Sequence, residues 1–139
     1  MRDKCFLDSN LLVYLYDQNE PEKRNYIESF LRKIKQTELP VISTQTIGEF
    51  FNVTTKKLKY PKDIITEVCE DFNNYFPIYE ISVDNVYHAL MISKQTHFSY
   101  WDSLIIAVAI DIGCSVVYSE DLNSGQMIEG VKVINPFCV

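Results

Sequence analysis

The chain has 139 residues, the usual size of one domain, and 47% of its residues are apolar, which is enough for a normally packed core. Its net charge of −6 and pI near 4.8 argue against nucleic-acid binding through a broadly basic surface, because such binding depends on Lys and Arg. The longest apolar stretches, such as Leu104 to Ile110, are far shorter than the roughly 20 residues that cross a bilayer, and the first residues lack a secretory signal pattern. We therefore expect a single cytoplasmic domain spanning residues 1–139.

Several common catalytic and metal-binding patterns are missing from the sequence. The four cysteines are scattered without a Cys-x-x-Cys pair, so they support neither a zinc site nor a redox motif. The sequence contains no glycine-rich phosphate loop and no Gly-x-Ser-x-Gly motif, and the spacing of His88 and His97 does not pair them on one helix face. The candidates for chemistry are therefore carboxylates.

In the first half of the chain, short apolar strands alternate with amphipathic helices. Ser9 is expected to cap the first helix, and Pro21 lies near the start of the second. Helix periodicity and short apolar runs predict a strand at 5–7, a helix from residue 9, a helix over 20–36, a strand at 40–43 and a helix over 45–58.

The second half continues the alternation. Ser82 and Asp84 are plausible caps for one helix, and Gly113 is expected to end another. The predicted elements are a helix from residue 61, a strand at 77–81, a helix through 86–91, a helix over 99–112, and strands at 115–119 and 131–134. This order predicts an α/β fold with a mostly parallel sheet and helices on both faces.

Two acidic residues follow predicted strands. Asp8 comes directly after the first strand, and Asp121 follows the strand at 115–119. Ligands bind beyond the carboxyl ends of parallel strands, so both residues are candidates for a site. Asp8 could equally act as a helix cap, and an acidic loop such as the one that contains Asp121 is most often an exposed turn.

Two further acidic residues lie in apolar helical segments. Glu49 directly precedes Phe50 and Phe51, although it could pair with a distant cation or form a capping box with Thr46. Asp102 precedes the apolar run at 103–109, so its helix is expected to be buried and its carboxylate to need a partner. The helix dipole would stabilise such a charge by only about 0.3 to 1 kcal/mol.

Carboxylates gathered in one pocket repel one another, so either their pKa values rise or a cation neutralises them. No Lys or Arg is adjacent in sequence to Asp8, Glu49, Asp102 or Asp121, which favours a metal ion. Ligands that are all oxygen suit Mg²⁺ or Mn²⁺. Such a site supports attack by an activated water on a phosphodiester bond.

Four acidic blocks, in this order along the chain, resemble the PIN-domain nucleases. The blocks are Phe6-Leu7-Asp8-Ser9-Asn10, Thr46-Ile47-Gly48-Glu49-Phe50, Tyr100-Trp101-Asp102-Ser103-Leu104 and Tyr118-Ser119-Glu120-Asp121-Leu122. The tail from Gly125 to Phe137 resembles the ending of the VapC-type toxins within that family, so the likeness covers essentially the whole chain. It implies a three-layer sandwich around a short-stranded, mostly parallel sheet and a Mg²⁺- or Mn²⁺-dependent endoribonuclease. It also implies frequent homodimers and neutralisation by a cognate antitoxin protein.

The resemblance also implies roles for individual residues. Asp8 and Asp102 match the main metal ligands, and Glu49 and Asp121 match acids that complete the site directly or through water. Asn10 and Ser119 match supporting polar residues that orient these carboxylates.

Contacts with RNA have less support in the sequence. The basic cluster that follows the Glu49 helix could touch RNA, although such clusters are most often solvated helix faces; it consists of Lys56, Lys57 and Lys59. Tyr14, Tyr16 and Trp101 could stack on bases, but Trp101 is expected to pack in the core.

Other functions remain open at this point. A PIN nuclease of RNA processing or of structured DNA, or a catalytically silent PIN-like module for protein binding, would share most of the pattern, although the complete set of four acids favours a nuclease. A haloacid-dehalogenase-type phosphatase would need a second Asp two residues after Asp8, where this chain has Asn10. The helices of the first half are candidates for a dimer interface.

Overall fold

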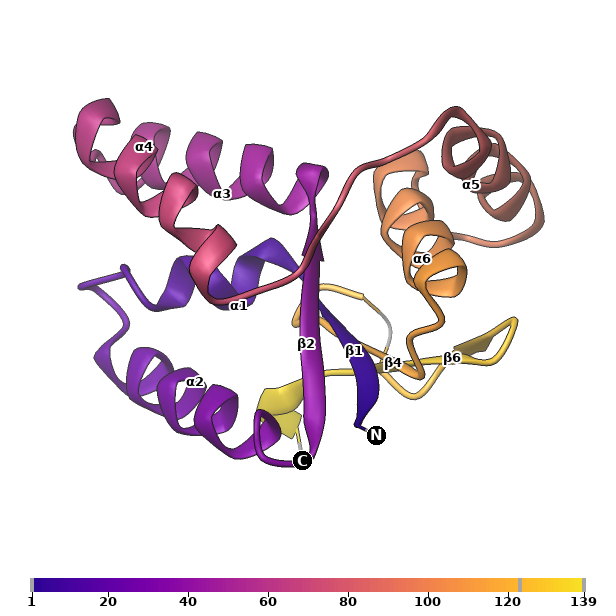
Figure 1. Cartoon of the computed structure of the whole chain (residues 1–139), viewed down its shortest axis with the longest axis horizontal. Coiled ribbons are helices and arrows are strands. Elements are labelled where there is room, and N and C mark those ends of the chain that lie inside the picture. Colours follow the sequence, from indigo (N-terminus) through magenta and orange to yellow (C-terminus); the bar gives the residue numbers. More distant parts are fainter. Residues whose placement is uncertain (1, 123, 139) are drawn as a thin grey trace.

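The computed structural model describes residues 2–122 and 124–138, and its centre is one sheet of short strands (Figure 1). The strands are β1 (Asp3–Leu7), β2 (Glu38–Ser43), β3 (Ile78–Tyr79), β4 (Val116–Tyr118), β5 (Met127–Ile128) and β6 (Val131–Ile134). They lie in the order β3-β2-β1-β4-β6-β5, and every neighbouring pair is parallel except β5 and β6. The predicted mostly parallel sheet is confirmed.

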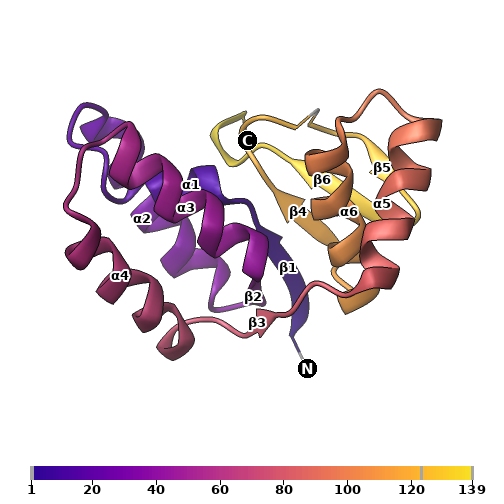
Figure 2. The ribbon, with the colours of Figure 1, turned by 90° about the horizontal axis from the view of Figure 1, so that it is seen from above.

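Helices cover both faces of this sheet. Figures 1 and 2 show α1 to α4 on one side and α5 and α6 on the other. Their bounds are α1 (Ser9–Tyr14), α2 (Pro21–Ile34), α3 (Thr44–Lys56), α4 (Lys62–Asp71), α5 (Val83–Gln95) and α6 (Tyr100–Ile112), with 3-10 turns η1 (Phe72–Asn74) and η2 (Pro136–Cys138). Among the described residues, no helix is long and apolar enough to cross a membrane. The three-layer α/β sandwich is confirmed.

Each face of the sheet has its own hydrophobic core. Along β1, Phe6 packs into the core under α5 and α6, whereas Cys5 and Leu7 pack into the core under α1 to α4. This alternation follows from the two-residue period of a strand, and it explains why β1 reads as a continuous apolar run. The predicted buried helix is α6, in which every residue from Ser103 to Ala109 is buried.

Element boundaries agree with the sequence where a local signal sets them. Ser82 and Ser99 accept backbone hydrogen bonds as the N-caps of α5 and α6, and Gly113, at φ +86°, ends α6. The expected strand at 77–81 is shortened to two residues, and the two-residue strand β5 was not predicted. Both are edge strands, whose short pairing leaves little hydrophobic pattern.

Candidate acidic active site

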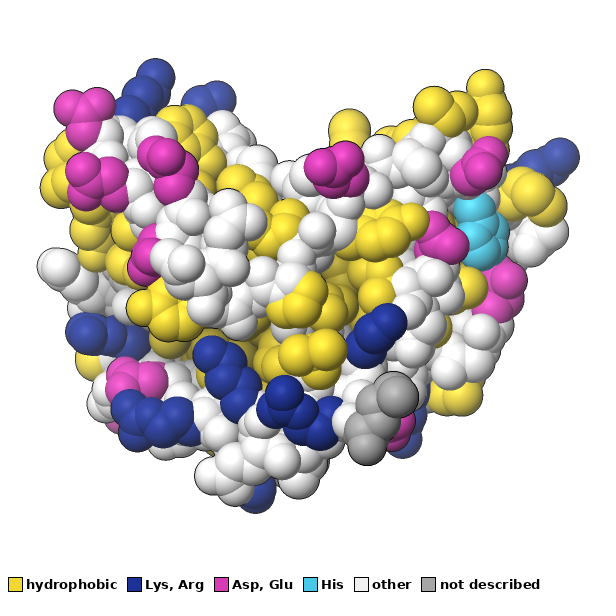
Figure 3. Space-filling view, viewed as in Figure 1, with side chains coloured by type: hydrophobic (Ala, Val, Ile, Leu, Met, Phe, Trp, Pro, Cys, Tyr) yellow, Lys and Arg dark blue, Asp and Glu magenta, His cyan; other side chains and the backbone are white. Residues whose placement is uncertain are grey.

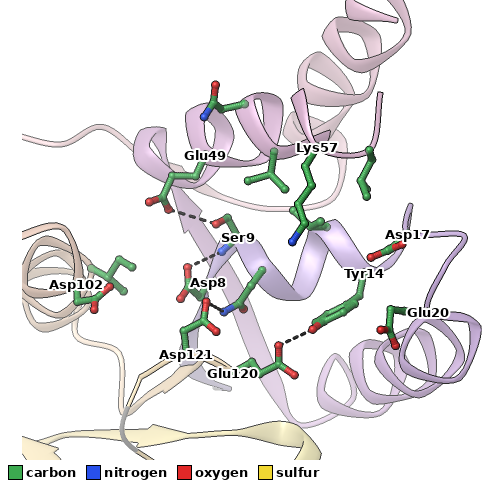
Figure 4. Close-up of a pocket in the computed structure, with 16 residues that line it drawn as sticks. Asp8, Ser9, Tyr14, Asp17, Glu20, Glu49, Lys57, Asp102, Glu120 and Asp121 are labelled. Atoms are coloured by element: carbon green, nitrogen blue, oxygen red, sulfur yellow. Dashed lines mark hydrogen bonds between the residues drawn. The ribbon is translucent and has the colours of Figure 1, made fainter. Parts of the chain in front are cut away.

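A pocket of about 520 Å³ opens at the carboxyl ends of the central strands, and all four predicted acids line it (Figure 4). Asp8 directly follows β1, and Asp121 lies in the loop after the neighbouring parallel strand β4. Glu49 comes from α3 and Asp102 from the first turn of α6, on the opposite side of the sheet. Four segments that are distant in sequence thus meet at one edge of the sheet.

Asp8 is both the cap of α1 and a pocket residue. Its Oδ1 accepts a hydrogen bond from the Ser9 backbone N–H at 2.7 Å, and its Oδ2 accepts one from Ser119 Oγ at 2.6 Å. Asp8 is only 8% exposed. Burial raises the pKa of this carboxyl to about 6, and the charges of Glu49 and Asp121 make smaller contributions in the same direction. The expectation that Ser9 caps this helix is wrong, because Ser9 is already its first residue.

Glu49 is held by two neighbours. Its carboxylate accepts a hydrogen bond from Ser9 Oγ at 3.2 Å and another from Gln45 Nε2 at 3.4 Å. Burial raises its pKa, and the charge of Asp102 raises it further. The alternative capping box of Thr46 with Glu49 is wrong, because α3 begins earlier and its capping box joins Ser43 to Thr46.

Asp102 and Asp121 complete the lining of the pocket. Burial raises the pKa of Asp102, and the charge of Asp121 adds to the effect. Asp121 accepts a hydrogen bond from Asn10 Nδ2 at 3.0 Å, and its backbone N–H donates to Ser119 Oγ at 3.2 Å. The predicted supporting residues Asn10 and Ser119 therefore hold Asp121 and Asp8 in place, and Asn10 Nδ2 lies 3.4 Å from Ser119 Oγ.

The described residues supply no salt bridge to any of the four acids. The oxygen-only donor set of the four acids suits a divalent cation, and so do the pKa values of Asp8, Glu49 and Asp102, which burial and neighbouring acids raise. As the side chains lie, no group of three His, Cys, Asp or Glu in the described part of the chain is close enough to hold an ion. The donor chemistry fits Mg²⁺ or Mn²⁺, and the side chains must move closer together to bind it.

A second polar cluster lies beside the acids and was missed at the sequence level. Glu120 accepts hydrogen bonds from Tyr14 Oη at 2.5 Å and from Lys23 Nζ at 2.8 Å, and Lys23 lowers its pKa. Lys23 also lies over the rings of Tyr14 and Phe137. Because Lys23 is 97 residues away from Glu120, no local pattern pairs them.

The residues predicted to contact RNA are separated by the fold. Lys57 extends from the end of α3 into the pocket (Figure 4), whereas Lys56 and Lys59 are not part of its lining. Tyr14 lines the pocket, and Tyr16 packs against the ring of Phe50 instead.

The prediction that Trp101 packs in the core is wrong, because this residue is 61% exposed. Asp102, the next residue, lines the pocket, and the apolar run that follows is buried. A place next to a buried run in the sequence therefore does not predict that a residue is buried, because successive residues on a helix point in directions about 100° apart.

The fold and the pocket together define an α/β protein with an acidic site at the carboxyl edge of a parallel sheet. A family model described as PIN domain matches residues 5–126, which is most of the chain. The chain belongs to the PIN-domain family. None of the curated protein sequences compared with it matches.

Solved structures with the same fold include chains of toxin–antitoxin complexes. A chain of FitAcB from Neisseria gonorrhoeae has 18% identity and a TM-score of 0.71, with 97% of this chain and 99% of that chain covered. A chain of VapBC2 from Rickettsia felis, crystallised with a promoter DNA fragment, has 15% identity and a TM-score of 0.68, with 94% and 96% covered. VapC20 from Mycobacterium tuberculosis, described as a sarcin-ricin loop cleaving toxin, has 11% identity and a TM-score of 0.64, with 81% and 86% covered. At these identities the likeness shows the fold.

Proposed function

We propose that this protein is a divalent-metal-dependent endoribonuclease and the toxin of a type II toxin–antitoxin pair. The observation that carries the proposal is that four acids line one pocket without a salt bridge from any described residue, and that burial and mutual repulsion raise the pKa values of Asp8, Glu49 and Asp102. The PIN family and the toxin–antitoxin complexes among its structural relatives support the same reading. That role would place the protein in the cytoplasm.

In this proposal, Asp8 and Asp102 hold the ion, and Glu49 and Asp121 complete the site directly or through water. When bound, Mg²⁺ or Mn²⁺ supplies a Lewis acid and lowers the pKa of an attacking water. Ser119 keeps one oxygen of Asp8 oriented through its 2.6 Å hydrogen bond, and Asn10 does the same for Asp121. These two hydrogen bonds orient Asp8 and Asp121, which limits the rearrangement by which the four acids come together around the ion.

Substrate contact in this proposal is local because the protein is acidic overall. The side chain of Lys57 has no hydrogen bond or salt bridge to another described residue, and it reaches into the pocket from the opposite wall to Glu120 (Figure 4). We propose that the Lys57 ammonium group contacts a phosphate of the RNA backbone. Lys23 is less suited to this role, since Glu120 already neutralises it.

The cognate antitoxin is proposed to lie over an apolar groove between α1, α2 and α4. This groove has a volume of about 280 Å³ and carries Lys35 and Asp71 on its walls. Its apolar lining consists mainly of Leu12, Leu15, Leu31, Val68, Phe72 and Phe76. An amphipathic segment presents the matching apolar face. Co-expression with the product of a neighbouring short reading frame should yield a complex that cleaves no RNA, and an active complex would contradict the assignment.

The homodimer is proposed to form through α5 rather than through the helices of the first half. Figure 3 shows hydrophobic side chains gathered over α5, and four large ones on this helix are more than half exposed: Val83, Tyr87, Leu90 and Met91. Two copies of α5 packed antiparallel about a twofold axis would place Tyr87 against Met91 and Asp84 against Lys94 in both directions. Sedimentation should show a dimer that Tyr87→Glu dissociates, and a wild-type monomer at all concentrations would contradict this interface.

The test of the enzymatic proposal is cleavage of labelled tRNA, ribosomal RNA and single-stranded oligonucleotides in Mg²⁺, Mn²⁺ or EDTA. Asp8→Asn and Asp102→Asn variants with confirmed folding serve as controls. We expect cleavage that needs the metal and disappears in both variants. Binding of an antitoxin without cleavage of any RNA would instead indicate a silent PIN-like module, and cleavage of structured DNA alone would indicate a different PIN nuclease.

A further inference from the structure

The single tryptophan of the chain has an unusual position. Trp101 is 61% exposed, although it directly precedes the most buried helical segment of the protein. A large apolar side chain left in water is unfavourable, so an exposed one next to a functional pocket is a candidate for ligand contact. The next residue, Asp102, lines the acidic pocket.

The indole of Trp101 is held in place by neighbouring groups. The ring of Tyr100 packs against it edge to face, with centroids 4.9 Å apart and an interplanar angle of 72°. Ser99 caps the helix turn that carries Trp101, by accepting a hydrogen bond from the Asp102 backbone N–H. A supported ring loses little conformational freedom when a ligand stacks on it.

The backbone of Trp101 is also connected to the acidic site from the opposite side of the sheet. Gln45 Nε2 donates to the Trp101 carbonyl at 3.2 Å and lies 3.4 Å from Glu49 Oε2. Gln45 therefore links the start of α6 to the helix that carries Glu49. The backbone that carries the indole is thereby tied to the helix of Glu49, one of the four acids.

We propose that Trp101 is a stacking platform for an unpaired nucleobase of single-stranded RNA, next to the nucleotide whose phosphate is cleaved; this rests on the proposed nuclease function. The acidic pocket offers few cations to hold a polyanion, and Lys57 is the lysine that lines it. Stacking on an aromatic ring supplies affinity that does not depend on neutralising phosphates. The site therefore selects unpaired bases, since the face of a paired base is covered by its neighbours in a duplex.

The test uses the full-length protein in EDTA, where RNA can bind without being cleaved. Because Trp101 is the only tryptophan, intrinsic tryptophan fluorescence reports on this position alone. We expect a short labelled single-stranded RNA to quench this emission as its own anisotropy saturates, and an abasic RNA of equal length to quench it much less. Trp101→Ala should weaken the Kd about tenfold, and Trp101→Phe should restore most of the affinity.

The matched control is Tyr75→Ala, which removes an aromatic side chain of similar exposure, 60%, at the end of η1 and outside the lining of the acidic pocket. This variant should leave the Kd for RNA unchanged. Saturation of the RNA without any change in tryptophan emission, or equal Kd values for Trp101→Ala and Tyr75→Ala, would overturn the proposal. A change in sedimentation of Trp101→Ala with an unchanged Kd would also overturn it, by assigning the indole to a protein interface.

Metal-dependent cleavage by the wild type separates the two proposals. If the wild type cleaves RNA and Trp101→Ala has the same KM and kcat, the nuclease function stands and the stacking site does not. An increase in KM with little change in kcat supports a contact with substrate outside the reacting atoms. Failure of the wild type to bind or cleave any RNA would refute both.

Discussion

The stability of the metal-free Asp8→Asn variant, measured relative to the metal-free wild type, should be higher at neutral pH than at acidic pH. Asp8 is 8% exposed, and burial with neighbouring acids raises its pKa from 3.8 to about 6. At 1.36 kcal/mol per pKa unit, this rise corresponds to about 3 kcal/mol of lost stability once the carboxyl ionises. Asn has no charge to bury, so the variant does not lose this stability.

The direction with pH follows from proton binding. Well below pH 3.8, Asp8 is protonated in both the folded and the unfolded state, and it makes no pH-dependent contribution. Between pH 3.8 and about 6, the folded protein retains a proton that the unfolded chain has released, so the wild type loses stability as the pH rises. Well above pH 6 the loss is complete and constant.

The assay is urea unfolding in EDTA at several pH values from 4 to 7.5, for the wild type and Asp8→Asn. The amide no longer accepts the hydrogen bond from Ser119, which costs about 1 kcal/mol at every pH. At pH 4 the carboxyl of the unfolded chain is already more than half ionised, so the free energy of unfolding of the variant minus that of the wild type should rise by about 2.4 kcal/mol from pH 4 to pH 7.5. A difference that stays constant over this range would refute the assignment of a raised pKa to Asp8.

Three further predictions concern the metal, the substrate and the fold. Mn²⁺ at 100 times its Kd for the wild type should raise the wild-type free energy of unfolding in urea by about 2.7 kcal/mol. The same Mn²⁺ concentration should raise that of Asp102→Asn far less. Equal increases in the two proteins would show that the ion binds elsewhere. Lys57→Ala should raise KM several-fold with little change in kcat, whereas Lys56→Ala, outside the pocket lining, should change neither. Gly113→Ala should cost about 1 kcal/mol in urea unfolding, because φ is +86° although a Cβ would meet no neighbour; an unchanged stability would contradict this strain.

Much of the fold follows from local sequence patterns. Helix periodicity and caps such as Ser82 and Gly113 depend on residues only a few positions apart, so they can be recognised without the tertiary structure. The α/β class also follows, because short apolar strands that alternate with helices have few ways to bury both faces. The placement of Asp8 and Asp121 at one edge follows from the parallel direction of β1 and β4.

The sequence by itself thus determined the order of the elements, the α/β class and the candidate acids. Only the tertiary structure decided which side chains meet: Ser9 with Glu49 across 40 residues, Gln45 with the Trp101 carbonyl across 56, and Lys23 with Glu120 across 97. It also decided that Trp101 is exposed. Periodicity records which residues share a face of one element, but the partners of that face are set by how the elements pack, and such contacts leave no local pattern in the chain.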